Sequence, residues 1–135
     1  MKLKLVKKND VQRSDKDLDT ICEFIDFCGD KLSMEGDVKV CLNGKGTGDT
    51  GISTGGYDRV TNDISTREHG RSLVDMLRSI AHELVHQRQR ETGKIGLNED
   101  IPNIGGEIED EANALSGQLV KMYVDEHDGR WLYQH

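Results

Sequence analysis

The motif His82-Glu83-Leu84-Val85-His86 constrains the fold more than any other feature of this sequence. Residues four apart in an α-helix lie about 40° apart around the helix axis, so the two imidazoles would project side by side and could bind one metal ion together. Glu83 would lie about 100° from His82, which is too far round for a natural third ligand but close to a water bound to the ion. The motif therefore predicts a zinc half-site on a helix, with Glu83 as the general base that takes a proton from the zinc-bound water.

The helix that carries this motif should begin at Ser72 and end before Gly93. Ser72 and Asp75 occupy the positions of a capping box, and Gly93 follows a run of helical periodicity. Ser79 falls on the histidine side, where a small residue would leave room for a ligand. We expect the buried face to be separate from the metal face, because apolar residues recur on the side opposite the histidines: Leu73, Leu77, Ile80 and Leu84.

A catalytic zinc site needs a third protein ligand and one open position. The metzincin pattern would place glycine at position 89 and histidine at position 92, but these positions hold Gln89 and Thr92. The next histidine, His127, is far along the chain, so a carboxylate is the better candidate. Acidic residues crowd the start of a helix predicted over 107–126, where they would also favour the helix dipole: Glu107, Glu109, Asp110 and Glu111.

One side of this third helix differs from the other. Small and polar residues follow Glu109 at helical spacing, namely Ala112, Asn113 and Ser116. Small side chains there would let this helix approach the helix that carries the histidine motif. Asn113 could hydrogen-bond a ligand histidine at the ring nitrogen that does not bind the metal. The other side is predicted to be apolar: Ile108, Leu115, Leu119 and Met122.

Together, H-E-x-x-H and the E-x-x-A-[DN] pattern at 109–113 resemble the gluzincin branch of zinc peptidases. Residues 72–120 are most similar to short zincin-like proteins of tailed bacteriophages, and more distantly to ImmA/IrrE-type proteases. The resemblance implies one Zn²⁺ per chain held by His82, His86 and Glu109, with Glu83 as the base. It implies a zinc-dependent endopeptidase that acts on a protein or peptide substrate, in the host cytoplasm or associated with the virion.

Two further expectations concern catalysis. Peptidases of this kind usually add a Tyr or His that stabilises the developing oxyanion, and Tyr57 is slightly favoured over Arg59 and His69. The substrate is expected to add as an extra strand at a sheet edge formed by the strand before the metal helix. The alternative function is a non-catalytic zinc-binding structural or interaction protein, such as a phage particle component.

The remaining segments predict a single α+β domain over 1–135, in which a small mixed sheet of three or four strands packs against three helices. The resemblance implies that this domain has a minimal zincin-like fold. Strands are predicted at 2–6, near a sheet edge, and at 38–42, with Cys41 on the more polar face. A helix should run from Ser14 to Gly29 with Cys22 and Cys28 in the core. A hairpin is predicted over 57–67 with its turn at 61–63, whereas the glycine-rich stretch 43–56 matches no phosphate-binding motif and is expected to be a loop.

Charge and composition exclude several classes of partner. The formal net charge is −7, and the sequence has no cluster of lysine and arginine with interleaved aromatic residues. Binding to nucleic acid or to a membrane is therefore not expected. The three cysteines form no C-x-x-C pair, which favours a reduced, intracellular protein. The basic start MKLKLVKK lacks the continuous apolar stretch of a signal peptide, and no stretch is apolar enough for a membrane span.

Overall fold

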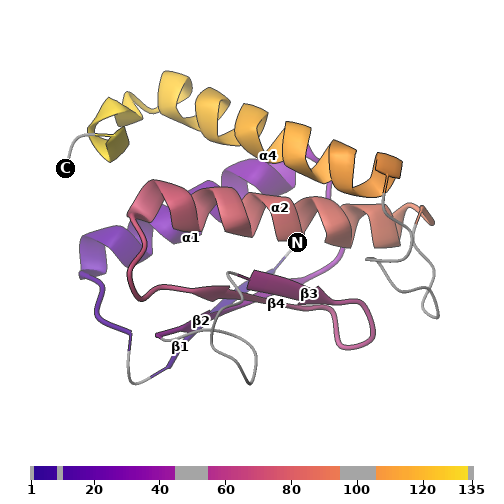
Figure 1. Cartoon of the computed structure of the whole chain (residues 1–135), viewed down its shortest axis with the longest axis horizontal. Coiled ribbons are helices and arrows are strands. Elements are labelled where there is room, and N and C mark those ends of the chain that lie inside the picture. The colour runs from indigo at the N-terminus through magenta and orange to yellow at the C-terminus, as the bar shows by residue number, and fades with distance from the viewer. Residues whose placement is uncertain (1, 9–10, 45–54, 95–105, 134–135) are drawn as a thin grey trace.

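A mixed sheet with helices over one of its faces forms the fold, as the α+β prediction required (Figure 1). The computed structural model describes residues 2–8, 11–44, 55–94 and 106–133. Figure 1 shows α1 and α2 above the sheet and α4 above α2. The elements are β1 (Leu3–Lys7), α1 (Asp15–Lys31), β2 (Val38–Asn43), β3 (Gly55–Asp58), β4 (Asp63–Arg67), α2 (Leu73–Glu91), α4 (Gly106–Glu126) and the 3₁₀ helix η1 (Gly129–Tyr133).

The four strands lie in the order β1-β2-β4-β3. β1 and β4 both pair with β2 in parallel, while β3 and β4 form an antiparallel hairpin in which Tyr57 pairs with Ile64. Asn62 takes a positive φ of 66° in the turn, a conformation that asparagine tolerates better than most residues. The predicted hairpin and the edge position of β1 are therefore confirmed.

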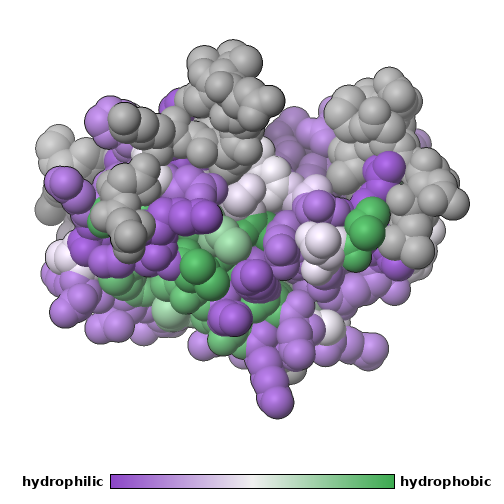
Figure 2. All heavy atoms as spheres, turned by 90° about the horizontal axis from the view of Figure 1, so that it is seen from below, coloured by the Kyte–Doolittle hydropathy of each residue, from purple (hydrophilic) through white to green (hydrophobic). Residues whose placement is uncertain are grey.

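Alternation along the strands divides the sheet into a covered and an uncovered face. On β2, Val38, Val40 and Leu42 are buried under the helices, whereas Lys39 and Cys41 are partly exposed on the other face, as predicted. Figure 2 views the molecule from the uncovered side and shows apolar atoms near the middle of that face with hydrophilic atoms around them. The helices therefore cover only the inner face, and this is the side on which the histidine motif lies.

The first helix ends later than the glycine signal predicted. Gly29 is buried inside α1, which continues to Lys31, and the left-handed position is taken by Ser33 with φ 53°. The helix is extended because Leu32 and Met34 are also buried, so apolar contacts continue past the glycine. Cys28 is in the core as expected, but Cys22 is only half-buried, which corrects the prediction for that residue.

Helix α2, which carries the histidine motif, has the predicted ends but is more buried than predicted. Its N-cap is Ser72, whose hydroxyl accepts a hydrogen bond from the Asp75 amide, and Gly93 takes a positive φ just after its end. The helix contacts α1, α4, β3 and β4, so it is buried on nearly every side. The histidine face is distinct from the apolar face, but α4 covers it, and His86 is only 2% exposed.

The third helix packs with its small-residue side inward. Ala112 and Ser116 are buried together with Leu119, Val120 and Tyr123, and α4 makes extensive contact with α2. The predicted close approach is confirmed. The predicted apolar face is partly wrong, because Met122 is 38% exposed and the helix lies on the outside of the molecule.

The predicted loop 43–56 lies mostly outside the described residues, because 45–54 is not described. The loop is shorter than predicted at both ends, since Asn43 belongs to β2 and Gly55 and Gly56 belong to β3. Among the helices that the structure describes, none combines the length and apolar character needed to cross a membrane.

Candidate metal centre

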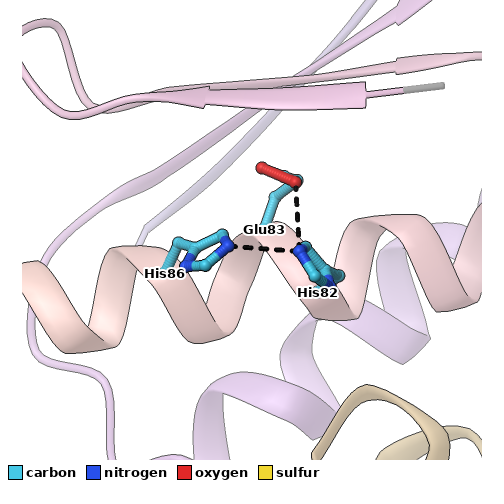
Figure 3. A group of neighbouring side chains, drawn as sticks. All are labelled: His82, Glu83 and His86. Carbon is cyan, nitrogen blue, oxygen red and sulfur yellow. Dashed lines mark hydrogen bonds and ion pairs between the residues drawn. The ribbon is translucent and has the colours of Figure 1, made fainter. Parts of the chain in front are cut away.

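Three side chains from two helices bring their ligand atoms together. On α2, Nε2 of His82 lies 3.1 Å from Nε2 of His86, and Figure 3 shows both rings projecting from the same side of the helix. From α4, Glu109 places one carboxylate oxygen 2.9 Å from His86 Nε2 and the other 3.4 Å from His82 Nε2. Ligand atoms around a tetrahedral zinc ion lie roughly 3.3 Å apart, so these spacings resemble the edges of such a site.

The hydrogen bonds of Gln89 decide which nitrogen of His86 faces this cluster. The Gln89 amide nitrogen donates to the Ile108 carbonyl at 3.1 Å and to Glu111 at 2.9 Å, so the amide oxygen must be the atom 2.8 Å from His86 Nδ1. An amide oxygen only accepts, and Nδ1 therefore carries a proton. The neutral His86 ring then presents the lone pair of Nε2 to the cluster, which is the form that binds metal.

The neutral form is also favoured for the second histidine. Burial, followed by the neighbouring His86, lowers the pKa of His82 below its usual value of 6.5, although Glu109 and Asn113 act in the opposite direction through hydrogen bonds. Asn113 thus lies close enough to His82 to affect its pKa, and its role in supporting a metal ligand stays a prediction. A lowered histidine pKa favours the neutral imidazole at neutral pH.

When His82, like His86, carries its proton on Nδ1, the two Nε2 atoms and the Glu109 carboxylate are all acceptors. A carboxylate oxygen and an imidazole lone pair 2.9 Å apart repel each other unless a proton or a metal ion lies between them. Two imidazole nitrogens and one carboxylate form a donor set that suits zinc. The residues present therefore fit a zinc ion with three protein ligands.

Glu83 is the other carboxylate near the histidines, but its position differs from that of Glu109. The His82, Glu83 and His86 ligand atoms all lie within 4.8 Å of one another. The Glu83 carboxylate is 3.9 Å from His82 Nε2, whereas the two Glu109 oxygens lie 3.4 Å from His82 Nε2 and 2.9 Å from His86 Nε2. Its side chain points from α2 toward the strands (Figure 3). Burial, with a smaller effect from Glu109, raises the pKa of Glu83 to about 8, a value suited to taking up and releasing a proton near neutral pH.

The structure does not bring Tyr57 into this group. Its hydroxyl donates to the Asn62 side chain at 2.5 Å within the hairpin, and burial raises its pKa to about 12. Ser79 does not leave open space either, because its hydroxyl accepts a hydrogen bond from Arg71 at 2.5 Å. His127 stacks on Tyr123 near the C-terminal end of α4, so it too belongs to a different part of the molecule, as its position in the sequence predicted.

Sequence reasoning missed Gln89. Position 89 was predicted only to lack the glycine of a metzincin, although the sequence places an amide three residues after His86, on the same side of the helix. That spacing could have predicted a hydrogen bond between Gln89 and the His86 ring. What the sequence could not show is that α4 supplies the acceptors that fix the orientation of the amide.

Comparisons with models of protein families, with curated proteins and with solved structures found no match to this chain. The resemblance to gluzincins therefore stays a prediction from the two motifs.

Proposed function

We propose that this chain is a zinc-dependent metallopeptidase of the gluzincin type. The observation that carries the proposal is the convergence of His82, His86 and Glu109 within 2.9–3.4 Å, beside the buried carboxyl of Glu83. A structural zinc site would need four protein ligands, whereas three leave one position for a water or a substrate. The nearby carboxyl with a raised pKa is the group that a hydrolytic site requires in addition.

The roles of the side chains follow from their positions. Zinc, when bound, would polarise a peptide carbonyl and make an attacking water more acidic. Glu83 would take the proton of that water and later pass it to the departing amine, because its carboxyl lies beside both histidines. Asn113 and Gln89 would hold the histidine rings in place.

An extended peptide would add beside β3. The strand before α2 was expected to form the substrate edge, but that strand is β4, which lies inside the sheet between β2 and β3. β3 is the outer strand and it contacts α2, the helix that carries Glu83. A substrate backbone paired with β3 would run along the side of the sheet nearest the metal helix.

The test is the substitution Glu83→Gln. This variant should bind one zinc per chain as the parent does and should lose about 10²- to 10⁴-fold in cleavage rate of an unfolded protein substrate, measured by mass spectrometry of the products. Glu107→Gln is the matched control, because Glu107 is an exposed glutamate in the first turn of α4. Equal cleavage rates for Glu83→Gln and the parent would remove Glu83 from the mechanism.

The alternative is a zinc-binding structural or interaction protein without turnover. The observation that favours it is the engagement of the Tyr57 hydroxyl by Asn62, since Tyr57 was the residue expected to stabilise the oxyanion. Full zinc occupancy together with no chelator-sensitive cleavage across a broad peptide library would support this function over the first.

A further inference from the structure

We infer that Gln89 is a positioning residue that sets both halves of the metal centre, orienting His86 through its carbonyl and the first turn of α4 through its amino group. The inference rests on the proposed zinc site, and it concerns how that site is assembled rather than what it hydrolyses.

The amide of Gln89 has no freedom to turn. The side chain is 1% exposed, and its oxygen and both of its N–H groups have partners: His86 Nδ1 at 2.8 Å, the Ile108 carbonyl at 3.1 Å and Glu111 at 2.9 Å. A rotation by 180° would set an N–H donor against the Nδ1 proton and the carbonyl against two acceptors. The observed orientation is therefore the only one that satisfies all three partners.

The Gln89 amide also helps to hold the turn of α4 that carries Glu109. Ile108 and Glu111 flank Glu109 in the first turn of α4, whereas the Glu109 side chain itself is 36% exposed and so is only partly held by packing. Glu111 is fixed further by Lys94, whose ammonium lies 2.9 Å away. Because Gln89 ties α4 to α2 at this turn, the position of the third ligand depends on it.

The chain offers a matched control on the same helix. Gln87 is 0% exposed, and its amide nitrogen donates to the Asp37 carbonyl at 3.0 Å and to Glu91 at 3.2 Å. Gln87 and Gln89 therefore each donate to one backbone carbonyl and one glutamate. They differ in the amide oxygen, which contacts His86 only in Gln89.

The experiment compares Gln89→Met with Gln87→Met in the full chain. Zinc affinity is measured by competition with a chromophoric chelator, and the proton on His86 Nδ1 is followed by NMR of the ¹⁵N-labelled metal-free protein. Gln89→Met should weaken zinc binding about 10- to 100-fold and abolish the slowly exchanging Nδ1 proton signal. Gln87→Met should leave the affinity within about threefold of the parent and keep the signal. A third variant, Gln89→Glu, keeps an acceptor for His86 and removes the donors to α4, so it should retain the Nδ1 signal while binding zinc more weakly.

Each outcome decides the inference. Unchanged zinc affinity and an unchanged Nδ1 signal in Gln89→Met would overturn it, and so would an equal loss of affinity in Gln87→Met, because the effect would then follow from removing any buried amide. If Gln89→Met does not fold, Gln89→Glu carries the same test, and loss of its Nδ1 signal would contradict the assignment. A parent chain that binds no zinc would refute the proposed function, whereas the NMR signal would still report on the bond between Gln89 and His86.

Discussion

Replacing Glu83 by glutamine should change how the stability of the metal-free protein depends on pH. The pKa of Glu83 is raised from 4.5 to about 8, chiefly by burial, so the folded state binds a proton that the unfolded state has released. A raised carboxyl pKa makes the free energy of unfolding fall as pH rises from the unfolded value through the folded one. Between pH 7 and pH 8.5 these two pKa values give a fall of about 1.3 kcal/mol for this group alone.

This pH window separates Glu83 from most other titrating groups. The lowered pKa of His82 affects stability mainly below its usual value of 6.5, and the lowered pKa values of Asp58 and Glu111 act in the acid range. The raised pKa of Cys28 begins to contribute near the upper limit, but it is common to parent and variant. Urea unfolding of both proteins with excess chelator should therefore show the parent losing about 1.3 kcal/mol more than Glu83→Gln. Equal losses would refute the placement of this carboxyl in a buried site.

Three shorter predictions concern the ligands, the hairpin and the core. Glu109→Ala should abolish the stabilisation by zinc, which for the parent is about 2.7 kcal/mol at a free zinc concentration 100 times Kd, whereas Glu107→Ala should retain it. If thermal unfolding showed that zinc stabilises Glu109→Ala but not Glu107→Ala, the third ligand would be Glu107 instead of Glu109. Tyr57→Phe should change kcat/KM less than about threefold, because its hydroxyl is engaged within the hairpin, and a loss of about 100-fold or more would instead place it at the oxyanion. Iodoacetamide should modify the half-buried Cys41 well before the fully buried Cys28, and peptide mapping that showed equal rates would contradict the packing of α1.

Local patterns in the sequence were sufficient to predict most of the helices and strands and the grouping of the two histidines with Glu83 and Glu109, whereas the metal itself stays a prediction. Ser72 and Gly93 marked the ends of α2 because an N-cap and a left-handed C-terminal residue are set by neighbours within one turn. The same logic failed at Gly29, where the burial of Leu32 and Met34 extends the helix, since tertiary contacts outweigh a local stop signal.

What the sequence could not show is the packing of one element on another. The histidine face of α2 was expected to be separate from the core, but α4 covers much of it and buries His86 while His82 stays partly exposed. Only this contact reveals the partners of Gln89. The sequence also could not show that β3, and not β4, is the outer strand of the sheet. A hairpin can be predicted from its turn, but which of its strands faces the rest of the sheet depends on long-range pairing with β2.

The crowding of acceptor atoms between α2 and α4 would also tie the abundance of this protein in a cell to its metal supply. On the proposed function, loss of the ion would leave the Glu109 carboxylate facing the imidazole nitrogens, which would weaken the docking of α4 and raise the unfolded fraction. Proteases that degrade unfolded chains would then remove the metal-free form faster than the loaded one. If the chain binds zinc as proposed, zinc starvation would shorten its half-life.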